Sequence, residues 1–508
     1  MATISPLYNL DQLSSWKPCH NDELCRARVS LKCNNNNTSR SSKTKSKAKT
    51  LMCHDFKGGY LDDKYVDGTN KIDGYYFHNW QFIDTFVYFS HHFITIPPPC
   101  WVNAAHTNGV KVLGTIITEW DEGAERCRRL LEDFEPVVDK LVSIVEFYGF
   151  EGWLINIENK IDKGQVAALV GFVKCLTTKL HALNPNYEVI WYDSVTDTGA
   201  LKWQNKLNHR NKCYFDVCDG IFLNYTWKSS DFPDTVELAA ERFRDVYVGV
   251  DVFGRGCPGG GGFNSNQALS AIREHDLSVA IFAPGWTYEH NPKDFIDNEI
   301  KFWNLLKPGL YIHGPEVVPL VTSFCQGWGH RLHKSGQVVS DEPWCNLSLQ
   351  QYQPTCQYTA DDQPGLQLHW VTDDGYNGGG SIQIRRTSHQ RQNDVTSTKI
   401  TLLKCNIKIS KALKFSYTFK KISSGGGRRS SDLFVQFEIH SKRDGIENIT
   451  FDNSNKSGET EENDWITRFG YSIDNEMIGD KIKKIKLVCS AANEFSFLLG
   501  QIALVPAI

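Results

Sequence analysis

The 508-residue sequence lacks several features that would narrow its class at once. It has 15 cysteines but no CxxC pair, and this odd number of scattered thiols favours neither a zinc ribbon nor a disulfide framework. No run of about 18 consecutive apolar residues is present to span a bilayer, and residues 1–19 show no basic segment followed by an apolar one. We therefore expect a cytoplasmic protein with reduced thiols and no membrane segment.

Strong charge and the common cofactor motifs are also missing. The formal net charge is −4, so the chain lacks the basic excess that binds nucleic acid phosphates. The motifs GxxxxGK(S/T), HExxH and GxSxG do not occur. Residues 254–259 match GxGxxG, but they follow the seventh expected strand and contain a proline, which favours a substrate loop over a dinucleotide site. We expect no cofactor, metal ion or nucleic acid partner, and the oligomeric state stays open.

The chain instead contains a regular alternation of short apolar runs with segments of helical periodicity. Strands are expected at 50–56, 85–91, 110–117, 152–158, 187–195, 220–227, 246–253 and 278–286. Helices are expected at 102–108, 125–148, 165–183, 236–244, 267–275 and 294–306. Such alternation produces parallel strands with right-handed crossovers, and eight units in about 240–260 residues predict a closed (β/α)8 TIM barrel. An open doubly wound sheet is the alternative.

The flanking segments differ in character from this region. Residues 1–48 include a polar Asn, Ser, Lys and Arg run, which predicts a flexible N-terminal segment before a barrel at 49–315. From about residue 316 strand follows strand, as at 399–409, 413–419, 433–440, 482–489 and 494–504. Residues 316–508 therefore predict a jelly-roll-like β-sandwich region, with one or two sandwiches.

One strand ends in a pair of polar residues. Asn156 and Glu158 lie two positions apart after an apolar run, so both side chains point to the same face of the strand. If they face the barrel interior, Leu154 does too, while Trp153 and Ile155 pack outward. A carboxyl group in that place is costly unless it is used or paired, which makes Glu158 a candidate general acid/base.

Other polar and aromatic residues stand where the remaining strands end, and barrels place their sites there. The residues at these strand ends are His54 and Asp55, His91 and His92, Glu119 and Trp120, Tyr192 and Asp193, residues 224–227, Asp251 and Phe253, and Trp286 with Tyr288. We select as substrate-binding residues Trp203, Trp227, Trp286, Asn224, Tyr225, Phe253, Glu119, Trp120, His54 and Asp251. Aromatic rings interspersed with Asn, Asp and Glu suit sugars better than phosphate esters.

The amide of Asn156 matters for the type of sugar chemistry. Glycoside cleavage commonly uses two carboxyl groups, but here the partner of Glu158 is an amide, which can serve neither as nucleophile nor as base. It can orient a nucleophile from the substrate, such as the 2-acetamido group of an N-acetylglucosamine. Attack by that group would give an oxazoline intermediate and net retention.

Several blocks of the sequence resemble a known family. They are Cys53 to Leu61, Phe86 to His91, Thr95 to Pro98, Asn103 to His106, Val110 to Trp120, Gly149 to Asn159, Trp191 to Ser194, Trp203 to Asn205, Cys218 to Trp227, Val252 to Gly256 and Ala283 to Trp286. In this order the blocks resemble the endo-β-N-acetylglucosaminidases of glycoside hydrolase family 85, in their cytosolic animal form.

The resemblance implies hydrolysis of the bond between the two core N-acetylglucosamines of an N-glycan, on glycoproteins or free oligosaccharides, with some transglycosylation. Carried over residue by residue, it implies that Glu158 is the general acid/base, that Asn156 orients the acetamido group and that Tyr192 assists there. Trp203 and Trp227 would line the substrate site. Two alternatives stay open at this point, a non-catalytic glycan-binding barrel and a chitinase-like hydrolase, which would have Asp in place of Asn156.

Overall fold

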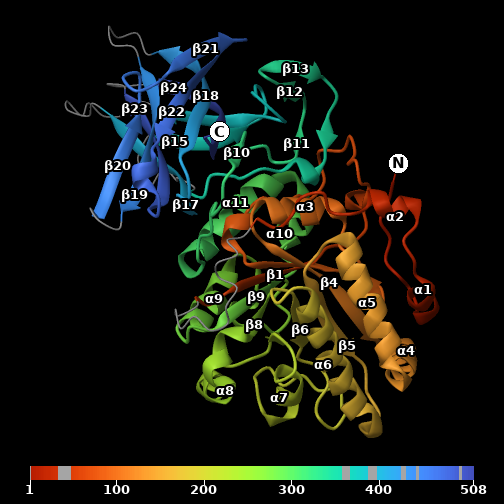
Figure 1. Cartoon of the computed structure of the whole chain (residues 1–508). Coiled ribbons are helices and arrows are strands. Elements are labelled where there is room, and N and C mark those ends of the chain that lie inside the picture. Colours follow the sequence, from red (N-terminus) through yellow and green to blue (C-terminus); the bar gives the residue numbers. More distant parts are fainter. Residues whose placement is uncertain are drawn as a thin grey trace.

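The structure, a computed structural model, describes residues 2–32, 47–356, 366–386, 397–424, 431–441, 445–490 and 495–507. A parallel barrel occupies one part of the molecule and a β-sandwich lies against its side (Figure 1). In barrel order the strands are β1 (Thr50–Asp55), β2 (Thr85–Phe89), β4 (Lys111–Glu119), β5 (Gly152–Glu158), β6 (Glu188–Tyr192), β7 (Gly220–Leu223), β8 (Val246–Asp251) and β9 (Ser278–Phe282). Pairing of β9 with β1 closes the barrel, which confirms the predicted fold.

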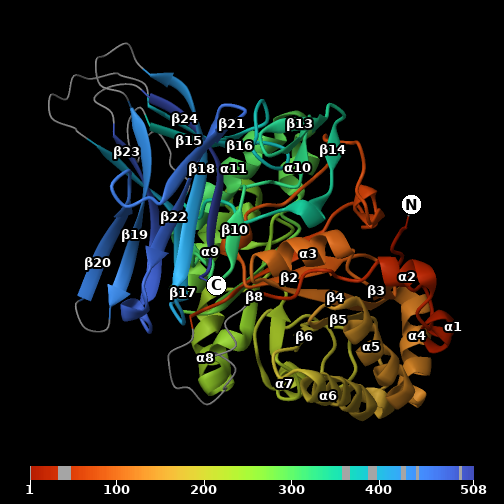
Figure 2. The ribbon, with the colours of Figure 1, turned by 45° about the horizontal axis from the view of Figure 1, so that its top comes forward.

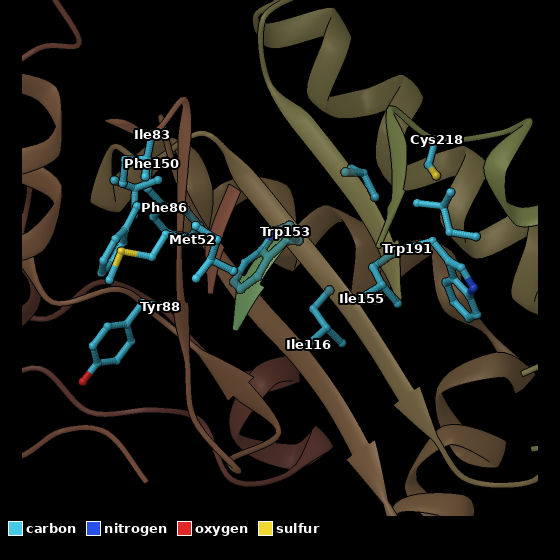
Figure 3. Packing of buried hydrophobic residues seen from close by; sticks show 14 of the residues in the cluster. Met52, Ile83, Phe86, Tyr88, Ile116, Phe150, Trp153, Ile155, Trp191 and Cys218 are labelled. Carbon is cyan, nitrogen blue, oxygen red and sulfur yellow. The ribbon is translucent and has the colours of Figure 1, made fainter. Parts of the chain in front are cut away.

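Side chains of the barrel strands divide into two apolar layers because alternate residues point to opposite faces. The inner layer holds Leu154 of β5 with residues such as Leu51 and Phe282, and these pack together inside the barrel. The outer layer holds Trp153 and Ile155 of the same strand, packed beneath the surrounding helices (Figure 3). The predicted orientation of β5 is therefore confirmed.

Helices surround the barrel on its outside (Figure 2). They are α3 (Pro99–Thr107), α4 (Trp120–Glu132), α5 (Phe134–Tyr148), α6 (Val166–Leu183), α7 (His209–Phe215), α8 (Phe232–Ala239), α9 (Ser265–Arg273), α10 (Trp286–His290) and α11 (Phe295–Leu306). The predicted helix 125–148 is two helices, because Asp133 leaves the helical region with φ −150° and ψ 85°. By length and composition the segment Lys163–Leu183 could cross a membrane, but its apolar face, with Leu169 and Leu176, is buried on the barrel.

The N-terminal residues 2–32 are folded onto the barrel. They contain α1 (Leu10–Ser15) and α2 (His20–Leu24). The structure differs here from the flexible segment predicted for residues 1–48, because the few apolar side chains, such as Leu10 and Leu13, are buried against the barrel instead of forming a core of their own. The polar run at 33–46 lies outside the described residues.

The C-terminal region contains two antiparallel sheets that share one core. The larger sheet holds β10 (Leu320–Thr322), β15 (Leu366–Val371), β16 (Ser381–Arg386), β18 (Leu413–Ser424), β21 (Gly458–Glu462), β22 (Trp465–Ile473) and β24 (Phe495–Pro506). The smaller sheet holds β17 (Thr398–Lys408), β19 (Asp432–Ser441), β20 (Gly445–Phe451) and β23 (Lys481–Ser490). A single apolar cluster joins both sheets, so the described residues form one sandwich.

A connecting region, which runs from the end of β10 to the start of β15, links the barrel to the sandwich. It contains the small strands β11 (Trp328–Gly329), β12 (Leu332–Lys334), β13 (Gln337–Ser340) and β14 (Trp344–Cys345). Trp328 and Leu347 of this region belong to the apolar cluster of the barrel, not to that of the sandwich. The connecting region therefore packs as a part of the barrel, beyond the boundary predicted at 316.

Candidate functional site

The carboxyl ends of the barrel strands surround a cavity of about 290 Å³. Its lining residues are Cys53, Asp55, Phe89, His91, Glu119, Leu154, Asn156, Glu158, Tyr192, Trp203, Phe222, Asn224, Tyr225, Arg255 and Phe282. The cavity thus brings together the three predicted catalytic residues and four of the selected substrate-binding residues. Leu154 forms part of its floor, as the alternation of β5 requires.

Asn156 and Glu158 are in direct contact in this cavity. Asn156 Nδ2 donates a hydrogen bond to Glu158 Oε2 at 3.1 Å, and the indole Nε1 of Trp203 donates to Oε1 at 3.2 Å. Burial raises the pKa of Glu158 above its usual range; the hydrogen bond from Asn156 opposes this, and the charge of Glu119 adds to it. Glu158 is therefore held in place by two neutral donors, and its proton is retained more strongly than that of an exposed glutamate.

A second polar network lies on the β6 and β7 side of the cavity. The Tyr192 hydroxyl donates to Asn224 Oδ1 at 2.9 Å, and Asn224 Nδ2 donates to Asn205 Oδ1 at 2.8 Å. The fully buried Asp193 accepts hydrogen bonds from the backbone N–H groups of Gln204 and Asn205, at 3.0 and 2.7 Å. Asp193 thereby fixes the loop that carries Trp203 to the cavity.

The opposite wall of the cavity is charged. His91 Nδ1 lies 3.1 Å from Glu119 Oε2, and His91 Nε2 lies 3.8 Å from Asp55 Oδ2. The two carboxylates raise the pKa of His91 to about 10, against the effect of burial, so the imidazole is positively charged at neutral pH. No group of three His, Cys, Asp or Glu side chains in the described part of the chain is placed to hold a metal ion.

Arg255 adds a second cation to the cavity. Its Nε lies 2.7 Å from Asp251 Oδ2 and its Nη2 lies 3.1 Å from Oδ1, while Asp251 also accepts a hydrogen bond from the Arg255 backbone N–H. Asp251 is fully buried and reaches the cavity only through this arginine. The glycine-rich segment 254–262 therefore serves to bring Arg255 to the cavity wall.

Asp55, His91 and Arg255 are cavity residues that the sequence-based selection leaves out. A positional signal was available for two of them, because Asp55 follows the cavity residue Cys53 by two positions and His91 follows Phe89 by two positions. No comparable periodicity marks Arg255, which lies in a loop.

Five other selected residues lie outside the cavity lining. His54 points away from it and is buried among rings, 4.8 Å from that of Trp101, where burial lowers its pKa to about 3. Trp227 is buried and its Nε1 donates to Gly249 O at 2.8 Å, and Trp286 stacks on His290 at 4.7 Å. The other two are exposed: Trp120 by 83% and Phe253 by 42%.

A (β/α)8 barrel whose cavity presents a buried acid beside an amide, with aromatic rings and hydroxyl-binding groups around them, defines a carbohydrate-active barrel of the glycoside hydrolase class. A sequence model of glycosyl hydrolase family 85 matches residues 60–332, and the chain belongs to this family.

Similar proteins agree with this assignment. A cytosolic endo-beta-N-acetylglucosaminidase of Gallus gallus is 44% identical over 387 residues, which are 75% of this chain and 52% of that protein. Cytosolic endo-beta-N-acetylglucosaminidase 1 of Arabidopsis thaliana is 46% identical over 345 residues, 66% of this chain and 50% of that protein. The chain thus spans about half the length of the curated relatives that it matches.

A solved structure has the same fold. The glycoside hydrolase domain of Endo-D from Streptococcus pneumoniae R6 superimposes with a TM-score of 0.76 over 99% of this chain and 83% of that chain, at 21% sequence identity. The likeness covers barrel and sandwich together.

Proposed function

We propose that this protein is an endo-β-N-acetylglucosaminidase that hydrolyses the β-1,4 bond between the two core N-acetylglucosamines of N-glycans. The observation that carries this proposal is the contact between Glu158 and Asn156 in the barrel cavity of a family 85 chain. The names of the relatives support the same activity. The substrates would be glycoproteins or free oligosaccharides, met in the cytosol.

Glu158 is the proton donor in the first step. Its raised pKa keeps it protonated near neutral pH more often than an exposed glutamate, so that it can protonate the glycosidic oxygen. The carbonyl oxygen of the substrate's 2-acetamido group attacks the anomeric carbon as the bond to the glycosidic oxygen breaks. This gives an oxazolinium ion, and the second N-acetylglucosamine leaves with the proton of Glu158.

Asn156 and Tyr192 act on the acetamido group. The Asn156 side chain accepts the acetamido N–H through its oxygen, which fixes the carbonyl oxygen beneath the anomeric carbon and stabilises the positive charge that develops on nitrogen. The Tyr192 hydroxyl, held in the same cavity by Asn224, contributes a second hydrogen bond to this group.

The second step restores the enzyme. The Glu158 carboxylate takes a proton from a water molecule as the water oxygen attacks the anomeric carbon and the oxazolinium ring opens to restore the neutral acetamido group. Two inversions give net retention of configuration. A sugar hydroxyl in place of water would give transglycosylation.

The charged wall argues against a second carboxyl group as nucleophile. Glu119, which lies beside Glu158, is paired with His91, and Asp55 lies on the other side of the same imidazole. Both carboxylates are therefore engaged with a cation, whereas the Asn156 amide faces the cavity with no charge.

The test is incubation with a high-mannose glycopeptide, followed by mass analysis of the products. The expected product is a glycan that ends in one N-acetylglucosamine, with the other left on the peptide. Glu158→Gln should lower kcat/KM by a factor of roughly 10²–10⁴ without loss of folding. Binding of the glycopeptide by folded wild-type protein without any release would reject the activity and favour a glycan-binding barrel.

A further inference from the structure

The charged wall of the cavity has no task in the steps above, although it lies directly beside the acid. Glu119 and Glu158 are partners in the parallel register of β4 and β5, so their Cα atoms face each other across adjacent strands. In-register residues of neighbouring strands point to the same face, and both side chains line the same cavity. The two carboxyl groups are therefore neighbours in an environment of restricted solvent.

Two features of the fold place positive charge beside Glu119. His91 Nδ1 lies 3.1 Å from its Oε2, and Glu119 is the residue immediately before α4, at the positive end of the helix dipole. His91 is in turn held between Glu119 and Asp55. Besides burial, the charge of Glu119 raises the pKa of Glu158, since two adjacent carboxylates in a cavity do not both ionise easily.

The other titratable or charged groups that line the cavity around Glu158 are Cys53 and Asp55 of β1, His91 after β2, Glu119 of β4, Tyr192 of β6, Tyr225 after β7 and Arg255 after β8. Burial raises the pKa of the Cys53 thiol well above its usual range, so this thiol is neutral. Arg255 is bound to Asp251, which compensates its charge. The tyrosines are neutral, because burial raises the pKa of each well above its usual range. The charges that remain unbalanced close to Glu158 are those of the Asp55–His91–Glu119 group.

We propose that Glu119 and His91 are an opposed pair of positioning residues for the acid/base: Glu119 favours the protonated form of Glu158, and His91 limits that influence. Both actions are needed if one side chain is to donate a proton in the first step and accept one in the second. An acid that held its proton too strongly would be a poor donor, and one that lost it too easily would be ionised before the substrate bound. This inference rests on the proposed function, of which it specifies the control of the acid.

The test compares Glu119→Gln, His91→Gln and the matched control His92→Gln, which replaces the neighbouring histidine outside the cavity lining. The pH dependence of kcat/KM for glycopeptide release reports the ionisation of Glu158 in the free enzyme. Glu119→Gln should move the alkaline limb of the profile by about one pH unit to lower pH, and His91→Gln should move it by about half a unit to higher pH. His92→Gln should leave the limb in place.

A second readout does not depend on turnover. Trp203 donates its indole N–H to Glu158, so the ¹⁵N resonance of this indole, assigned with Trp203→Phe, should titrate with the glutamate. The same opposite shifts are expected in the resonance. They can be measured even if the glycopeptide is not cleaved, which separates a failure of this inference from a failure of the proposed activity.

Three results would overturn the inference. They are shifts of equal sign in both variants, an indole resonance that titrates identically in all variants, and loss of release at every pH in Glu119→Gln as in Glu158→Gln. The last result would make Glu119 a catalytic group. Each variant has its own expected direction of shift. If one variant misfolds, the other therefore still tests the inference.

Discussion

Asn156 and Glu158 stand two residues apart on one strand, yet their surroundings give them unequal tasks. Burial and the charge of Glu119 raise the pKa of Glu158, against the effect of the hydrogen bonds that Glu158 accepts from Asn156 and Trp203. Asn156 has no proton to exchange, and its side chain can only bind and orient. The proposed function therefore assigns the acid/base role to Glu158 and the role of a polar clamp to Asn156, and it leaves the nucleophile to the substrate.

Replacement of Asn156 separates these tasks. Asn156→Ala should lower kcat/KM for glycopeptide hydrolysis by a factor of roughly 10²–10³, because the acetamido group loses its clamp during formation of the oxazoline. A sugar oxazoline supplied from outside already contains the strained ring, so the variant should still transfer it to an N-acetylglucosamine acceptor. The measurement is product formation from each donor by mass analysis.

Glu158→Gln, which lacks the acid/base itself, should lose hydrolysis while keeping the clamp. Hydrolysis of the glycopeptide by Asn156→Ala at the wild-type rate would show that the amide does not position the nucleophile.

The sequence could predict such residues only where strand periodicity marks them. The alternation through Leu154, Asn156 and Glu158 indicates the inward face of β5 without any knowledge of neighbours. Arg255 is different, because it lies in a loop, where no periodicity indicates that its side chain turns back to Asp251 at the end of β8. Trp227 shows the reverse case. A tryptophan at a strand end suggests a surface that binds sugar, but this ring is buried and packs against Phe232.

At the level of elements, the position of β5 depends on its first residue. Gly152 has a φ of +140°, and a Cβ atom there would lie 1.9 Å from the carbonyl oxygen of Glu188 on β6. A side chain at this position would force the two parallel strands apart. Because Asn156 and Glu158 follow on the same strand, a shift at its beginning also displaces the site.

Gly152→Ala should therefore lower the free energy of unfolding by about 2–4 kcal/mol, from backbone strain and the clash together. Chemical denaturation followed by tryptophan fluorescence measures this change. The matched control is Gly164→Ala, since no heavy atom lies within 4 Å of a Cβ atom built there. We expect it to change stability by less than about 0.5 kcal/mol. Equal stability of both variants would mean that β5 and β6 can separate at no cost.

Element boundaries were less predictable than element order. Periodicity located all eight strands of the barrel, but it joined α4 and α5 into one helix, because the apolar face continues across Asp133 while the backbone does not. The short α7 and α10 carry too few turns to show a period. These differences leave the barrel intact, since the strand order depends only on the alternation.

In the whole molecule, the connecting region completes the packing of the barrel. Trp328 and Leu347 lie in the apolar cluster of the barrel. Gln350 accepts a hydrogen bond from Trp80 Nε1 at 2.8 Å and donates one to the Phe77 carbonyl at 2.9 Å. A sequence pattern of strand after strand could not reveal this, because it records the class of structure and not the partner on which a segment packs.

This packing predicts different thermal stabilities for two truncated chains, one that ends at residue 315 and one that ends at residue 356. The shorter chain loses two buried apolar side chains, worth about 1.5–3 kcal/mol each, and leaves the Trp80 N–H without its partner, which costs about 1–3 kcal/mol. That sum is comparable with the total stability of an ordinary domain, about 5–15 kcal/mol. We expect the shorter chain to unfold at least about 10 °C below the longer one in a calorimetric scan, or to show no cooperative transition at all. Equal Tm values for the two chains would instead place the end of the barrel before the connecting region.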